Sequence, residues 1–127
     1  MNSYDLAKTF IAERGYRILE DEADDGHIVF RFQMNTIHLY CNPDDDNFIM
    51  ITLPNFTNVT DDNIAQVKEK CHEINKNARL VKLYVLNDII MASVEVYYLA
   101  KEDFMFQMGN ALKHLVAAKT MYKKMNE

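Results

Sequence analysis

At 127 residues, with 49% hydrophobic and 26% charged residues, the chain has the composition of one globular domain covering residues 1–127. The net charge of -5 argues against nucleic acid as the main partner, because phosphate binding needs clustered Lys and Arg. Met1 to Phe10 lack the pattern of a secretion signal and no apolar run is long enough to cross a membrane, so we expect a cytoplasmic protein with no membrane partner.

The chain opens on a predicted helix, capped by Asn2 or Ser3 and ended by Gly15, the residue type that most easily adopts left-handed backbone. An antiparallel meander of three or four strands is predicted next. Its first turn, at residues 25–26, has the Asp-Gly sequence typical of a tight hairpin. That turn is predicted to set Leu19 opposite Phe32.

The same hairpin is predicted to place Asp21 on the inner face beside Phe30, as an inward charge typical of an edge strand. The strands at 27–34 and 37–41 then alternate apolar and polar residues, which predicts one buried face. A turn at Asn35-Thr36 would pair Met34 with Ile37 on that face.

The acidic segment 42–47 is interpreted as a solvated turn before a strand at 48–53. A calcium loop would need a central Gly and a closing Glu, and the segment has neither. A second helix is predicted from a cap at Thr60 to Ala78, with Ile64 on its apolar stripe.

Strands at 79–86 and 89–99 are predicted to flank a two-residue turn, Asn87-Asp88. The turn sets Leu86 opposite Ile89, and the predicted pairing runs back to Val81 opposite Val94. A long amphipathic helix over 102–125 is expected to cover one face of the sheet. The predicted fold class is therefore α+β, with a single antiparallel sheet of five to six strands and packed helices in the order α-β-β-β(-β)-α-β-β-α.

The chain resembles the YbjN-like domain family, bacterial proteins whose fold is similar to that of type III secretion chaperones. The resemblance spans most of the chain, and the segments that carry it are the first helix, Asp25-Gly26, Pro43 to Asp46, Ile74-Asn75-Lys76-Asn77 and the terminal helix. It implies one antiparallel sheet with helices packed on it, no catalytic residues to transfer, and a tendency to dimerise or to bind other proteins.

No catalytic residue, cofactor or metal is predicted. The histidines lie on different elements, no nucleophile elbow is present, and three glycines form no phosphate-binding loop. Cys41 and Cys71 are not spaced as a metal or redox pair and are interpreted as buried free thiols. His38, beside Arg31 and Tyr40 on the outer sheet face, either binds an anion or is solvated.

The second face of the 79–99 hairpin carries the predicted partner-binding residues, which are Tyr84, Leu86, Ile89, Met91 and Tyr97. Either the 60–78 helix covers this face, or the face binds a protein partner or a second copy in a homodimer. We therefore predict a non-catalytic interaction module, chaperone-like or regulatory. The alternative is a small-ligand-binding domain or an enzyme, with a pocket between the sheet and the terminal helix lined by Met91, Met105 and Met108.

Overall fold

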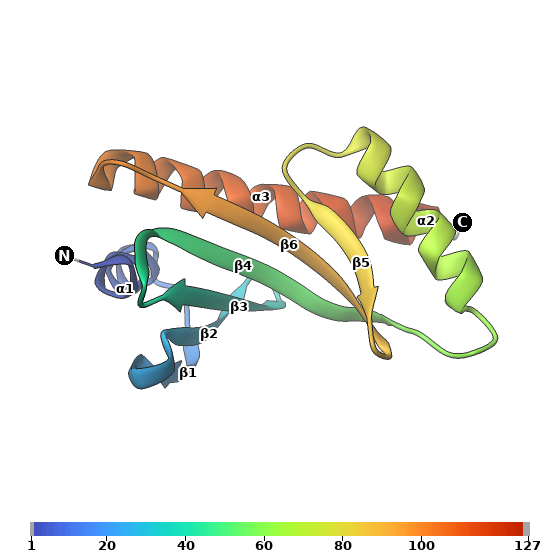
Figure 1. Cartoon of the computed structure of the whole chain (residues 1–127), viewed down its shortest axis with the longest axis horizontal. Coiled ribbons are helices and arrows are strands. Elements are labelled where there is room, and N and C mark those ends of the chain that lie inside the picture. Colours follow the sequence, from blue (N-terminus) through green and yellow to red (C-terminus); the bar gives the residue numbers. More distant parts are fainter. Residues whose placement is uncertain (1, 126–127) are drawn as a thin grey trace.

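The computed structural model describes residues 2–125 and contains three α-helices and one six-stranded antiparallel sheet (Figure 1). The predicted class and element order are confirmed. In chain order the elements are α1 (Ser3–Arg14), β1 (Ile18–Glu22), β2 (His27–Phe32), β3 (Asn35–Asn42), β4 (Asp45–Asn58), α2 (Ile64–Asn77), β5 (Lys82–Leu86), β6 (Ile89–Tyr97) and α3 (Lys101–Lys124).

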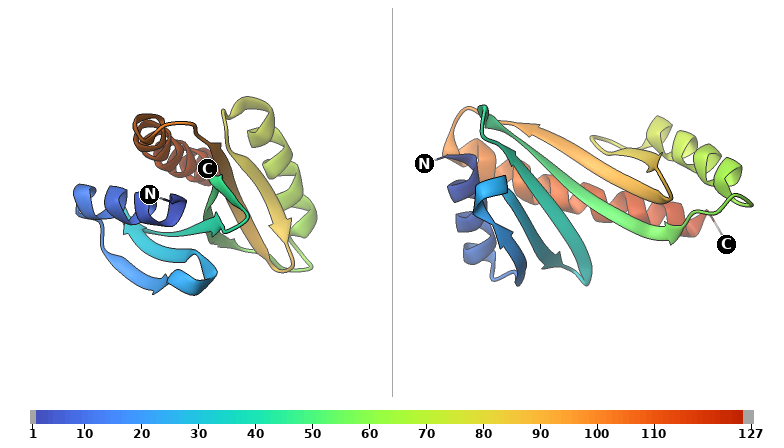
Figure 2. Two further views of the ribbon diagram at one scale, coloured as in Figure 1. Left: turned by 60° about the vertical axis from the view of Figure 1, so that its left-hand side comes forward. Right: turned by 60° about the horizontal axis from the view of Figure 1, so that its bottom comes forward.

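The sheet has the strand order β1-β2-β3-β4-β6-β5, and the helices contribute to one buried core on one of its faces (Figure 2). α3 lies along β6 and β4, α1 packs against α3 and β4, and α2 packs against β5 and α3. Phe10 of α1, Val67 of α2 and Leu112 of α3 share this core with Phe30 and Ile51 of the sheet. The fold is therefore two layers, helices on sheet.

The first helix forms as predicted. The Asn2 side chain accepts a hydrogen bond from the backbone N–H of Asp5 at 2.8 Å, which satisfies one of the unpaired amides at the helix start. Gly15 ends the helix with a φ of 72°, and its N–H returns to the last turn. Because Phe10 and Ile11 are fully buried, α1 is held by the core rather than by helix propensity alone.

The predicted register of the first hairpin is wrong. Residues 23–25 form a 3-10 turn, so the connection is longer than a two-residue turn, and Glu22 pairs with His27. Ile18 pairs with Phe30, and the register shifts before Glu20. Leu19, predicted to face Phe32, is instead exposed. The glycine at 26 is still required, because its φ is 63° and a Cβ there would lie 2.7 Å from the Cys41 carbonyl oxygen.

The second turn of the meander also differs from the prediction. Gln33 and Met34, with φ of 48° and 66°, form the turn, and Phe32 pairs with Asn35. Met34 is 88% exposed instead of buried against Ile37. Polar anchoring explains the shift, since the Asn35 amide donates to the Gln33 carbonyl and accepts a 2.6 Å hydrogen bond from Lys119. The prediction of which strand residues face the core still holds, because the pairing register moved by an even number of residues.

The segment predicted as an acidic loop is mostly strand. β4 begins at Asp45 and continues to Asn58, past the predicted end at residue 53, and only Pro43-Asp44 forms the turn. Asn42 stabilises that turn by accepting a hydrogen bond from the Asp44 N–H. Pairing with β6 on its far side explains the length of β4, since that neighbour is remote in sequence.

α2 begins at Ile64, not directly after a cap at Thr60. The Asn63 side chain accepts from the Thr60 N–H and donates to the Asn58 carbonyl, which closes residues 60–63 as a turn before the helix. The helix ends at Asn77, one residue before the predicted end.

The β5–β6 hairpin has the predicted register, with Leu86 opposite Ile89 and Tyr84 opposite Met91. Its far end was predicted incorrectly: β5 begins at Lys82, which pairs with Ser93, and Val81 does not pair with Val94. The positive φ of 68° at Leu80 turns the chain away from β6. α3 matches its predicted range within one residue at each end.

Candidate interaction surface

The face of the sheet opposite the helices, here called the outer face, is not covered by another element among residues 2–125. Cross-strand pairing places its side chains in rows, because paired residues of adjacent strands point to the same side. The outer-face residues given by the regular pairs are His27, Val29, Arg31, Thr36, His38, Tyr40, Phe48, Met50, Thr52, Pro54, Lys82, Tyr84, Leu86, Ile89, Met91, Ser93, Glu95 and Tyr97. The sequence left open whether the 60–78 helix covers this face. In the structure that helix, α2, packs into the core on the opposite side of the sheet.

All five predicted partner-binding residues belong to the outer face, but their exposure differs. Leu86 is 49% exposed and Tyr97 63%, whereas Tyr84 and Ile89 are half-buried. Met91 is only 9% exposed, so its side chain offers little surface to a partner. Tyr97 also lies apart from the others, at the opposite end of β6, so the five residues form a strip along the hairpin rather than one compact patch.

Two further outer-face residues, Phe48 and Met50 on β4, were not predicted. Phe48 is half-buried and packs against Tyr97, with ring centroids 5.0 Å apart. Met50 is also half-buried and lies between Tyr40 and Glu95 in the rows of pairs. The alternation of Phe48, Met50 and Thr52 indicates that these three side chains share one face of the sheet. Only the pairing of β4 with β6 shows that this is the outer face.

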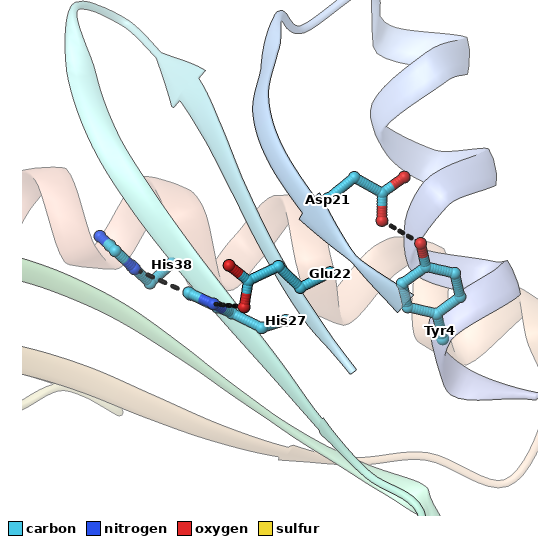
Figure 3. A network of polar contacts seen from close by, with 5 residues as sticks. All are labelled: Tyr4, Asp21, Glu22, His27 and His38. Atoms are coloured by element: carbon cyan, nitrogen blue, oxygen red, sulfur yellow. Dashed lines mark hydrogen bonds and ion pairs between the residues drawn. The ribbon is translucent and has the colours of Figure 1, made fainter. Parts of the chain in front are cut away.

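His27 of β2 and His38 of β3 point toward each other on the outer face (Figure 3), and Tyr40 of β3 lies beside them. His27 Nε2 and His38 Nδ1 lie 3.0 Å apart, and the two rings are within 18° of coplanar, so the contact is a hydrogen bond in the ring planes. The Tyr40 ring stacks on His27 with centroids 4.6 Å apart. Burial and the nearby His27 together lower the pKa of His38.

Glu22 completes this group, with its carboxylate 3.6 Å from His27 Nδ1 (Figure 3). A chain of Glu22, His27 and His38 could relay a proton, but it ends without a reachable nucleophile. The residue paired directly opposite His38 is Thr52, whose side chain is 0% exposed. The geometry therefore supports a partly buried, hydrogen-bonded histidine pair rather than a catalytic group.

Asp21 serves a structural role on the inner side of the same strand pair. It accepts a hydrogen bond from the Tyr4 hydroxyl (Figure 3). It also forms a 2.8 Å ion pair with Lys8, and the two contacts tie α1 to the edge strand β1. Both contacts lower the pKa of Asp21. Burial, with the hydrogen bond to Asp21, raises the pKa of Tyr4 to about 12. Asp21 is inward as predicted, although it pairs with Ile28 and not with Phe30.

The alternative pocket between sheet and terminal helix is not formed by the three methionines proposed for it. Met108 is fully buried in the core, whereas Met91 lies on the outer face, on the opposite side of the sheet. Within residues 2–125, no three His, Cys, Asp or Glu side chains are placed to hold a metal ion. Cys41 and Cys71 are free thiols, and burial raises the pKa of each, which disfavours the nucleophilic thiolate.

No helix among the described residues is both long and apolar enough to span a membrane. No family model and no curated protein sequence matches the chain. Several solved structures, in contrast, match the chain in their fold. YbjN from E. coli superposes with a TM-score of 0.68 at 12% identity, covering 96% of this chain and 90% of that one. An uncharacterised protein from Methanothermobacter thermautotrophicus superposes with a TM-score of 0.57 at 17% sequence identity, covering 97% of this chain and 98% of that one.

The type III secretion chaperone SycH of Yersinia pestis, solved in complex with a stable fragment of YscM2, superposes with a TM-score of 0.65 at 12% identity, covering 94% of this chain and 98% of that one. At such identities the likeness concerns the fold. The resemblance seen in the sequence is confirmed at that level: this chain has the fold shared by YbjN and the secretion chaperone SycH.

Proposed function

We propose that this protein is a non-catalytic interaction module that binds a protein partner, or a second copy of itself, through the outer face. One observation carries the proposal: the helices pack on a single face, and the other face presents aromatic, Met and Leu side chains to solvent. Tyr and Met are common in protein contacts because they offer large, adaptable apolar area. Glu22, His27 and His38 do converge on this surface, but the Thr52 side chain opposite His38 is fully buried, which argues against a catalytic role for the group.

Two structural neighbours are consistent with this role. One is a secretion chaperone solved with a bound protein fragment, and YbjN has been considered a transcription regulator. A chaperone-like or regulatory role, and a homodimer, are therefore part of the proposal. So is a cytoplasmic location in a bacterium, which suits two free thiols, Cys71 buried and Cys41 partly buried, since a reducing compartment keeps cysteines unpaired.

The test uses two outer-face positions that are exposed enough to change without disturbing the core. We expect Leu86→Asp combined with Tyr97→Asp to keep the circular dichroism spectrum and melting temperature of the wild type. Either the sedimentation coefficient should shift toward the monomer, or the partner captured by the wild-type protein from its native cell should be lost, because an isolated carboxylate is costly to bury at an interface.

Met34→Asp is the matched control, since Met34 is 88% exposed, lies in the β2–β3 turn and receives the same change. It should behave as the wild type. The proposal fails if the double variant and the wild type sediment identically and capture the same proteins, or if the wild type is a monomer that captures none.

A further inference from the structure

The upper part of β6 has an edge to which no strand is paired. β6 runs to Tyr97, but the last residue pair with β5 is Lys82 with Ser93 (Figure 1). Among the described residues, no strand pairs with positions 94–97 on that side, because Leu80 turns the chain away before β5 begins. The shortfall of β5 leaves a notch one strand wide, about 4.8 Å, at the edge of the sheet.

The backbone groups facing the notch can be assigned from the pairing. In an antiparallel strand, alternate residues direct both N–H and C=O to the same neighbour. The Tyr98 N–H donates to the Asn47 carbonyl on the β4 side, so Val96 and Val94 also bond to β4. Glu95 and Tyr97 therefore direct their N–H and C=O groups away from β4, into the notch.

The other two edges of the sheet are protected. Asn75 of α2 covers β5, because its side-chain amide donates to the Leu83 carbonyl at 2.8 Å and its oxygen accepts from the Leu83 N–H at 2.8 Å. β1 is short, and its residues 20–22 are all acidic, a common defence against edge pairing. Within residues 2–125, the notch on β6 has neither an overlying side chain like Asn75 nor a run of acidic residues.

Apolar surface surrounds the notch. On its inner side is a cavity of about 140 Å³ lined by Leu80, Val94, Val96, Gln107 and Ala111, among others. Gln107 also lines the adjoining cavity of about 310 Å³, beside Tyr97 and Leu99.

Two side chains that line these cavities are unusually exposed for their type: Leu99 at 93% and Leu80 at 61%. The notch therefore combines unused strand hydrogen bonds with pockets for apolar side chains.

We infer that an extended segment of a partner protein, about four residues long and with apolar residues at alternate positions, binds in this notch as an added strand beside β6. Backbone groups of Glu95 and Tyr97 supply the hydrogen bonds, and the inner cavity receives alternate side chains. A second copy of this chain fits poorly, because β5 projects one strand width beyond the notch in each copy and holds the two β6 edges apart. The site borders the outer face at Glu95 and Tyr97 but uses their backbone groups, and it does not depend on the proposed function.

The first measurement is amide hydrogen exchange of the protein alone. We expect the Glu95 and Tyr97 amides to exchange at least about tenfold faster than those of Val94 and Val96, since only the latter pair with β4. Protection of Glu95 and Tyr97 at every protein concentration would overturn the inference, because the edge would already be covered. Protection that grows with protein concentration would overturn it in favour of self-pairing.

The second measurement uses peptides selected on the wild-type protein from a phage-displayed library of random dodecamers. We expect a selected peptide to slow exchange at Glu95 and Tyr97 and to bind at least about tenfold more weakly to Glu95→Pro, which removes one notch-facing N–H but no bond to β4. Glu95→Gln, which keeps the N–H, and Leu86→Asp on the outer face should each bind within about twofold of wild type.

A third readout keeps the protein unchanged. N-methylation of the selected peptide at successive positions should weaken binding at every second residue, as strand pairing requires. Equal effects at all positions, no selected peptide that protects these amides, or full binding by a folded Glu95→Pro variant would each contradict strand addition. Failure of these tests would leave the outer-face proposal untouched.

Discussion

At the scale of single residues, the surroundings of a side chain decide its chemistry more than its type does. His38 and His27 share one hydrogen bond, so the two imidazoles cannot both be protonated without placing like charges 3.0 Å apart. Burial further disfavours the charged form of His38, and its pKa falls below the ordinary value of 6.5. Neither effect is visible in the sequence, where the two histidines are eleven residues apart.

This lowered pKa predicts that acidification destabilises the protein. The unfolded chain binds a proton at His38 near pH 6.5 while the folded chain does not, so the free energy of unfolding should fall as the pH drops below about 6.5. NMR titration of the histidine ring protons should give His38 a midpoint below 6.5. His27→Gln should raise that midpoint, because it removes the neighbouring charge. A wild-type midpoint at or above 6.5 would contradict the assignment.

At the scale of elements, α2 shows how a helix can close a sheet without lying on it. Its apolar stripe of Val67, Cys71 and Ile74 enters the core, and its polar Asn75 takes both edge-facing backbone groups of Leu83. Those backbone groups are half-buried, so leaving them unpaired would cost free energy. One side chain thus fixes the position of the helix along β5 and protects the strand.

We predict that Asn75→Ala lowers the free energy of unfolding by about 1 to 3 kcal/mol, because two backbone groups lose their partners. Urea denaturation measures this change, and light scattering should show more aggregation through the uncovered β5 edge. Asn77→Ala is the control, since Asn77 is exposed and only donates to the Glu73 carbonyl within its own helix. Its effect should stay within about 0.5 kcal/mol. Equal effects of the two changes would rule out the edge role of Asn75.

At the scale of the whole molecule, the core is one-sided. The fully buried large side chains belong to the helices and to the inner face of the sheet, among them Phe10, Phe30, Leu83 and Tyr122. The buried residues of the outer face are Val29, Thr52, Met91 and Ser93, and partly exposed side chains lie around them. A sheet covered on one side only is a common solution for antiparallel strands, and it leaves a surface available for binding.

A matched pair of leucines tests this asymmetry. Leu112→Ala, on the buried side of α3, should cost about 2 to 5 kcal/mol of unfolding free energy, because it opens a cavity in a packed core. Leu86→Ala on the outer face should cost less than about 1 kcal/mol in the monomer, since half of that side chain is already in solvent. Urea denaturation at low protein concentration gives both values. Similar losses would mean that the outer face is part of the core.

The fold was largely readable from local patterns. The alternation of residues in the strands, the apolar stripes of 64–78 and 102–125 and the Asn87-Asp88 turn predicted the element order, the last hairpin register and which side chains share a face. These signals depend on the chain within a few residues, where geometry is set by backbone and side-chain sterics. The five outer-face residues followed from the same alternation, because parity along a strand does not change with distant contacts.

What the sequence could not settle depended on partners far along the chain. The meander turns moved because Lys119 of α3 anchors Asn35 and because Gly26 packs against Cys41. The side on which α2 packs, and so the openness of the outer face, was decided by its contacts with β5 and α3. Periodicity thus determined the elements and their faces. Only the tertiary structure decided the register of the meander, which sheet face the helices cover and the unpaired edge of β6, because these arise from contacts between segments that local sequence does not encode.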